Sequence, residues 1–154
     1  METAEVNLLV ENLELLSGAA AIGGEEIYWE LARDAEIGRA DQRPVVVLSH
    51  GAGGSHAAWY QQVPAIGQHF RVLTWDSRGF GNSTNRTGQL APTNAANDLV
   101  AVLDHLEIFE AHLVGQSMGG WHVSAFLSLF SERVTSVTYA DTVGGLWTED
   151  LRRA

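Results

Sequence analysis

The sequence contains no cysteine and no lysine. The absence of cysteine excludes disulfides, thiolate metal sites and a thiol nucleophile. The absence of lysine excludes a Walker-type phosphate loop and a Schiff-base lysine, because both need that side chain. All 9 basic residues are therefore arginines, and against 19 acidic residues they leave a formal net charge of -10. This acidic balance argues against nucleic acids and anionic membranes as partners.

Long hydrophobic runs are also missing. The first residues, METAEVNLLVENLELL, carry glutamates where a signal peptide needs positive charge. No apolar run approaches the ~18 residues of a membrane-spanning helix. We therefore expect a cytoplasmic protein. At 154 residues, 45% of them hydrophobic, the chain is expected to form one domain over residues 1–154.

Short apolar runs alternate with helical patterns along the chain. Strands are predicted at residues 26–32, 44–49, 70–75, 111–115 and 133–140. Helices are predicted at residues 91–107, where leucine and valine recur at helical spacing, and at residues 119–130. Strands that alternate with helices indicate an α/β fold with a mostly parallel sheet.

Residues 115–119, GQSMG, fit the pattern G-x-S-x-G. The bare pattern also suits a tight turn with a solvated serine, but its place between a predicted strand and a predicted helix favours a nucleophile elbow. A strained turn would project the Ser117 hydroxyl from the sheet, and small neighbours would let the two backbones approach. The N–H of Met118, at the start of the helix, could then donate to an oxyanion.

A glycine-rich segment, HGAGGS at residues 50–55, follows the predicted strand 44–49. It fails as a dinucleotide loop because His56 stands where G-x-G-x-x-G needs its third glycine. An oxyanion loop fits better, with the free N–H supplied by Ala52. For the His50 side chain we expect a structural role, in hydrogen bonds to the loop backbone.

A third motif, DSRGFGNS at residues 76–83, follows the predicted strand 70–75. Its spacing predicts a tight turn that an internal ion pair between Asp76 and Arg78 stabilises. We assign it a structural role, and Asp76 is not assigned to catalysis.

In their order and spacing, the three motifs resemble the α/β-hydrolase fold family, over about residues 27–145. Within that family the chain looks most similar to the esterase, lactonase and carbon–carbon hydrolase branch. Relatives that open epoxides or displace halide use an aspartate at the elbow, so Ser117 argues against those reactions. The resemblance implies that Ser117 attacks a substrate carbonyl, that the N–H groups of Ala52 and Met118 hold the oxyanion, and that water releases the acyl-enzyme. It implies no metal and no organic cofactor.

The chain departs from the family in its missing histidine. The triad order of this fold is Ser, then Asp or Glu, then His, and the last two usually follow strands beyond the end of this sequence. The one histidine after Ser117 is His122, which we expect on the surface of the helix rather than as the base. Asp141, at the end of the last predicted strand, is a weak candidate for the triad acid or else a capping residue.

We therefore expect an incomplete, doubly wound sheet of the α/β-hydrolase type that lacks the last strands. Its exposed edge at residues 133–140 predicts marginal stability, self-association or a complementing C-terminal segment. Three functions stay open: the N-terminal portion of a serine hydrolase for a small-molecule ester or lactone, inactive alone; a non-catalytic binding protein of the same fold; and a nucleotide-binding domain. Trp59, Trp121 and Trp147 suit either an apolar pocket or the core.

Overall fold

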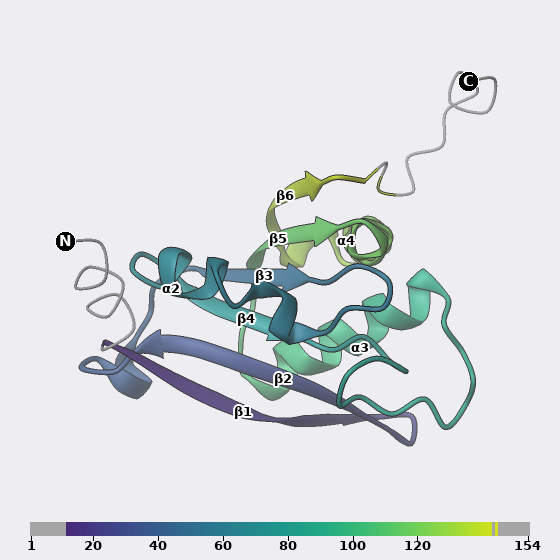
Figure 1. Ribbon diagram of the computed structural model, residues 1–154, viewed down its shortest axis with the longest axis horizontal. Helices are drawn as coiled ribbons and strands as arrows, with labels where there is room; N and C mark the ends of the chain where they lie inside the picture. Colours follow the sequence, from purple (N-terminus) through teal and green to yellow (C-terminus); the bar gives the residue numbers. More distant parts are fainter. Residues whose placement is uncertain (1–11, 143, 145–154) are drawn as a thin grey trace.

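The computed structural model describes residues 12–142 and 144, and it contains one six-stranded sheet with the order β1-β2-β4-β3-β5-β6 (Figure 1). The first two strands, β1 and β2, pair antiparallel, and β2 pairs antiparallel with β4. The strands β4, β3, β5 and β6 run parallel to their neighbours. The strands are β1 Leu13–Ile22, β2 Glu25–Asp34, β3 Val45–Ser49, β4 Arg71–Trp75, β5 Ala111–Gln116 and β6 Val134–Ala140.

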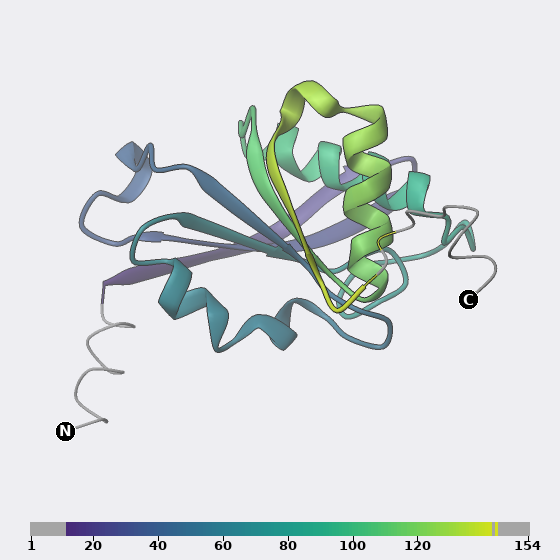
Figure 2. The same cartoon turned by 90° about the horizontal axis from the view of Figure 1, so that it is seen from above.

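Helices cover both faces of this sheet. Figure 2 shows the short helix α2, Gln62–Ile66, on one face, and α3, Pro92–His105, with α4, Met118–Leu129, on the other. The described residues also contain three short 3-10 turns: η1 Gly38–Ala40, η2 His56–Trp59 and η3 Ser131–Arg133. The predicted doubly wound α/β fold is confirmed. No helix of the described part of the chain has the length and apolar character needed to cross a bilayer.

The predicted strands and helices are present, but β1 and α2 were missed. The β1 sequence LELLSGAAAI has a Gly-Ala tract with weak strand preference, and its ten residues become a strand by pairing with β2 across a turn at Gly23 and Gly24. Both turn glycines have positive φ, 55° and 84°, which glycine adopts without steric cost. The α2 helix has only five residues, one of them a proline, too few to show a periodicity.

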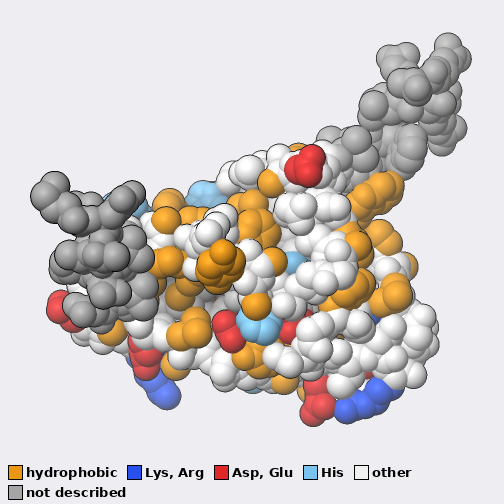
Figure 3. All heavy atoms as spheres, viewed as in Figure 1, with side chains coloured by type: hydrophobic (Ala, Val, Ile, Leu, Met, Phe, Trp, Pro, Cys, Tyr) orange, Lys and Arg blue, Asp and Glu red, His pale blue; other side chains and the backbone are white. Residues whose placement is uncertain are grey.

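The main core lies between the sheet and the helices α3 and α4. It includes fully buried Leu73, Leu99, Leu113 and Phe126. A smaller cluster of Ala32, Val46, Leu48 and Val72 lies on the α2 face. Figure 3 views that face, where hydrophobic side chains in orange remain at the surface.

The sheet brings the three motifs together, and β6 is one of its two outer strands. Because β4, β3 and β5 are parallel neighbours, the loops after these strands meet beyond their carboxyl ends, which is where ligands bind in such folds.

The strand β6 has one neighbour among the described strands, β5, so its outer side is an open edge, as predicted. The self-association expected from that edge stays a prediction.

Candidate active site

Ser117 occupies a sharp turn between β5 and α4. Its backbone has φ 50° and ψ -116°, a conformation that a residue with a side chain adopts only when the surroundings impose it. Hydrogen bonds to both the N–H and the carbonyl of Ser117 impose this conformation. The Ser117 N–H donates to the carbonyl of Ala140 at 3.2 Å, and the Ser117 carbonyl accepts from Thr142 Oγ1 at 2.7 Å and from the Gly120 N–H at 3.0 Å. The hydroxyl itself has no hydrogen-bond partner among the described residues.

The glycines around Ser117 are required by close approach of backbones. A Cβ on Gly115 would lie 2.5 Å from the carbonyl oxygen of Gly119, and a Cβ on Gly119 would lie 2.7 Å from the carbonyl carbon of Ser49. A Cβ on Gly120 would lie 2.6 Å from Thr142 Oγ1. Backbone of the elbow itself and of the end of β3 therefore leaves no room for a side chain at Gly115 and Gly119, whereas Gly120 packs against the Thr142 side chain.

The loop HGAGGS lies directly against the elbow. A Cβ on Gly51 would be 3.2 Å from the Cβ of Ser117. The Gly51 carbonyl accepts from the Gly54 N–H at 3.1 Å and contacts His50 Nδ1 at 2.8 Å. Because the C=O and N–H of a trans peptide point in opposite directions, these contacts turn the Ala52 N–H away from His50. Neither that N–H nor that of Met118, the first residue of α4, meets an acceptor in the described part of the chain.

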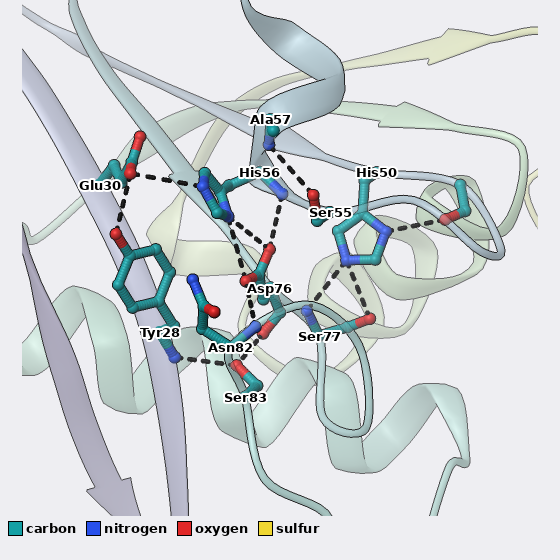
Figure 4. A network of polar contacts seen from close by, with 11 residues as sticks. Tyr28, Glu30, His50, Ser55, His56, Ala57, Asp76, Ser77, Asn82 and Ser83 are labelled. Atoms are coloured by element: carbon teal, nitrogen blue, oxygen red, sulfur yellow. Dashed lines mark hydrogen bonds and ion pairs between the residues drawn. The ribbon is translucent and has the colours of Figure 1, made fainter.

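His50 holds this loop and is itself held by the loop after β4. Its Nε2 accepts the Ser77 N–H at 3.1 Å, which assigns the ring proton to Nδ1, the nitrogen facing the Gly51 carbonyl (Figure 4). Burial lowers the pKa of His50, which agrees with a neutral ring. The predicted structural role of His50 is confirmed.

The predicted ion pair between Asp76 and Arg78 is wrong. The Arg78 guanidinium instead makes two bonds to Asp98 of α3, from Nε at 2.8 Å and from Nη2 at 2.6 Å. Fully buried Asp76 accepts the backbone N–H of His56 at 2.6 Å and that of Asn82 at 2.8 Å, as Figure 4 shows. The sequence spacing missed both partners because they lie on other elements, 20 residues away in the chain: His56 for Asp76 and Asp98 for Arg78. The structural role predicted for the cluster agrees with these bonds.

A base for Ser117 does not emerge from the described residues. All 6 histidines of the sequence lie in this part of the chain, and none forms a hydrogen bond with the Ser117 hydroxyl. His122 is not on the helix surface as predicted: it is only 5% exposed, and its ring lies 5.9 Å from that of Trp75. Position 122 faces the core because α4 packs that side on the sheet. Burial lowers the pKa of His122 to about 4.

Asp141 lies between two residues that contact the elbow, but it has no histidine partner among the described residues. It follows β6 directly, between Ala140 and Thr142, the two residues that bind the Ser117 backbone. Its own φ is 50°, and its side chain is exposed. Its role as the triad acid stays a prediction.

Sequence reasoning missed Thr142 and Gly120 as parts of the elbow. The second glycine of the SMGG run was a usable signal for Gly120, whereas no spacing rule points to Thr142, 25 residues after Ser117. Of the three tryptophans, Trp59 packs against the small cluster on the α2 face, Trp121 is half-buried, and Trp147 lies outside the described residues. The described residues contain no group of three or more His, Asp or Glu side chains arranged for a metal ion.

Comparisons with known proteins agree with this geometry. The family model for the alpha/beta hydrolase fold matches residues 44–154. The chain is 36% identical over 119 residues to 3-oxoadipate enol-lactonase 1 of Acinetobacter baylyi, covering 75% of this chain and 43% of that protein. It is 38% identical over 89 residues to a putative carbamate hydrolase RutD of Agrobacterium fabrum, covering 54% and 33%.

A solved structure gives the same result. The enol-lactonase of Burkholderia xenovorans LB400 superposes with a TM-score of 0.72 at 32% identity, covering 78% of this chain and 45% of that chain. The chain thus spans less than half the length of the relatives that it matches.

Proposed function

The chain belongs to the alpha/beta hydrolase fold family, and from that premise we propose that it is the nucleophile-bearing portion of a serine hydrolase. The substrate is a small molecule with an ester, lactone or related carbonyl bond. The names of the relatives, an enol-lactonase and a putative carbamate hydrolase, support this class of substrate. The observation that carries the proposal is the strained backbone of Ser117, with the loop at Gly51 packed so closely that a Cβ added to Gly51 would lie 3.2 Å from the Ser117 Cβ.

The reaction follows from these groups. The Ser117 Oγ attacks the carbonyl carbon and gives up its proton to a base, while the carbonyl electron pair moves to the oxygen. The N–H groups of Ala52 and Met118 stabilise that oxyanion, and each such donor is worth about 3 kcal/mol of barrier. Collapse of the intermediate expels the alcohol or enol oxygen, which takes the proton back, and water then hydrolyses the acyl-enzyme in the same way.

The base in this scheme is a histidine supplied from outside these 154 residues. Support comes from the Ser117 hydroxyl, which pairs with none of the six histidines, and from the open edge at β6, where further strands would pair. Asp141 is the candidate acid on this chain. We therefore expect the chain to be inactive alone and to associate at β6, either with itself or with a complementing C-terminal segment.

The alternative is a non-catalytic binding protein of the same fold. The lone Ser117 hydroxyl favours it, because serine is a weak nucleophile without a neighbouring base. The two functions differ in what happens when a histidine-bearing segment is added.

A fluorophosphonate probe separates the two functions. We expect no labelling of the chain alone. A chimera that continues residue 154 with the C-terminal portion of the Acinetobacter enol-lactonase should be labelled at Ser117, and the same chimera with Ser117→Ala should not. Far-ultraviolet circular dichroism and a cooperative thermal transition establish that the chimera is folded. A folded chimera that stays unlabelled would overturn the hydrolase proposal in favour of the binding protein.

A further inference from the structure

A cavity of about 360 Å³ lies on the α2 face, between the sheet and the segment that contains η2 and α2. Its apolar walls come from β1 and from residues in or just before α2, and they include Leu13, Leu15, Tyr60, Val63 and Pro64. Leu15 is 57% exposed and Tyr60 is 72% exposed, so large apolar side chains meet solvent on this face (Figure 3). The volume falls in the range of small-molecule sites, about 300–1,000 Å³.

A carboxylate and an imidazole, those of Glu30 and His56, also line the cavity. His56 Nδ1 lies 2.9 and 3.0 Å from the two carboxylate oxygens of fully buried Asp76, and His56 Nε2 lies 3.4 Å from Glu30 Oε1 (Figure 4). Glu30 and Asp76 bring two negative charges and His56 brings at most one positive charge. Every ion pair of an arginine in the described part of the chain is made with another carboxylate. The cluster is therefore net negative whether His56 is protonated or not.

One oxygen of Glu30 is available to a ligand. Oε1 accepts the Tyr28 hydroxyl at 2.8 Å, whereas Oε2 accepts no hydrogen bond from the described residues. The Glu30 side chain lines the cavity and keeps 22% of its surface exposed, so a molecule in the cavity can reach it. A carboxylate in an apolar recess favours a cationic donor, because charge-assisted hydrogen bonds are about twice as strong as neutral ones.

We propose that this cavity binds a small organic ammonium ion, whose apolar part lies against β1 and α2 and whose N–H donates to the Glu30 carboxylate. The net negative charge disfavours a carboxylate or phosphate ligand. The apolar walls disfavour a bare metal ion, and the described residues contain no group of three or more His, Asp or Glu side chains arranged for one. The site goes beyond the proposed hydrolase function, because its lining contains no residue of the elbow and binding needs no reaction at Ser117.

The test is ligand binding to the full chain, followed by nuclear magnetic resonance. The probes are benzylammonium, benzyl alcohol and benzoate, three aromatic molecules that differ mainly in the charge of the polar group. Two signals report on the cavity, the ring nitrogens of His56 and the methyl groups of Val63, because both side chains line it. We expect both signals to shift saturably with benzylammonium, which should bind about tenfold more tightly than benzyl alcohol, whereas benzoate should produce no saturable shift.

Variants separate the charge of Glu30 from the shape of the cavity. Glu30→Gln keeps an acceptor for Tyr28 and should abolish the preference for benzylammonium over benzyl alcohol. Glu26→Gln is the matched control, because Glu26 is also on β2 but is 59% exposed, pairs with Arg86 and does not line the cavity. It removes the same charge from the chain and should keep the tenfold preference. Leu15→Ala should weaken both ligands by the same factor, and thermal unfolding establishes that each variant is folded.

The comparison of the three probes on the unaltered chain decides the proposal even if a variant fails to fold. Equal affinities of benzylammonium and benzyl alcohol would overturn it, as would saturable binding of benzoate or the absence of any shift at His56 and Val63. Signals that move with protein concentration and not with benzylammonium would assign this face to a second copy of the chain instead. Ser117→Ala should leave the benzylammonium affinity unchanged, so failure of the hydrolase proposal and failure of this site are separate results.

Discussion

The elbow at Ser117 and the loop of residues 76–91 both lie at the carboxyl ends of the parallel strands, but different interactions fix their conformations. Backbone holds the elbow: Gly115 and Gly119 let main chains meet where no Cβ fits. Buried side-chain charges hold the loop, through Arg78 with Asp98 and through the Glu25 carboxylate. Adding a side-chain atom should destabilise the elbow, where backbones are in contact. Removing a charged partner should destabilise the loop, where buried charges are paired. Each can therefore be broken by a change that barely affects the other.

The largest effect is expected from Asp98→Ala. It leaves the Arg78 guanidinium buried without its carboxylate, and breaking a buried pair on one side costs about 3–5 kcal/mol. Asp104→Ala is the matched control, because Asp104 also lies on α3 and pairs with an arginine, Arg133, but its side chain is 63% exposed. That change should cost less than about 1 kcal/mol. The measurement is the free energy of unfolding in urea, and equal losses for the two variants would contradict the distinction.

The difference between the two regions also explains what the sequence could predict. The elbow and the oxyanion loop were found because their glycines and Ser117 are neighbours in the chain, so their geometry leaves a local pattern. The partners in the loop lie far apart: the backbone N–H of Arg86 bonds to Glu25 across 61 residues. No spacing rule reaches that far, and the nearest acid, Asp76, was wrongly paired with Arg78.

Within the helices, burial was predictable only where periodicity was clear. In α3, Leu99, Val102 and Leu103 recur at helical spacing and are buried. In α4 the sequence is apolar on most sides, so its pattern did not show that His122 faces the core rather than the solvent. The strand β1 was missed for a related reason, since pairing with β2 rather than its own composition makes it a strand.

A smaller loss is expected from Gly119→Ala, which tests the elbow. The added methyl group would lie 2.7 Å from the Ser49 carbonyl carbon and 2.8 Å from the His50 carbonyl oxygen, and neither backbone can yield without moving β3. Overpacking of this kind costs about 1–3 kcal/mol. Gly88→Ala is the control, because no atom lies within 4 Å of its added methyl group, although its φ of 69° adds strain of about 1 kcal/mol. Urea unfolding compares the two, and a Gly119→Ala variant as stable as Gly88→Ala would show that the elbow can relax.

The smallest effect is a dependence of stability on pH, and it sharpens the description of the loop. The Glu25 carboxylate accepts from Thr84 Oγ1 at 2.6 Å, from the Arg86 N–H at 2.9 Å and from the Thr87 N–H at 2.8 Å. These hydrogen bonds lower the pKa of Glu25 from 4.5 to about 2, and the bond from Thr84 has the largest effect. They favour the ionised form, which ties the β1–β2 turn to the loop.

Because the pKa is lower in the folded chain than in the unfolded chain, the stabilisation is present above pH 4.5 and is lost as the pH falls from 4.5 towards 2. Glu25→Gln removes this titration but keeps most of the shape of the side chain. The unaltered chain should therefore lose its advantage in unfolding free energy over the variant as the pH falls from 4.5 towards 2. Other carboxylates titrate equally in both proteins and cancel in the difference. A constant difference from pH 6 to pH 2 would mean that Glu25 contributes only shape, and that the Arg78–Asp98 pair holds the loop without it.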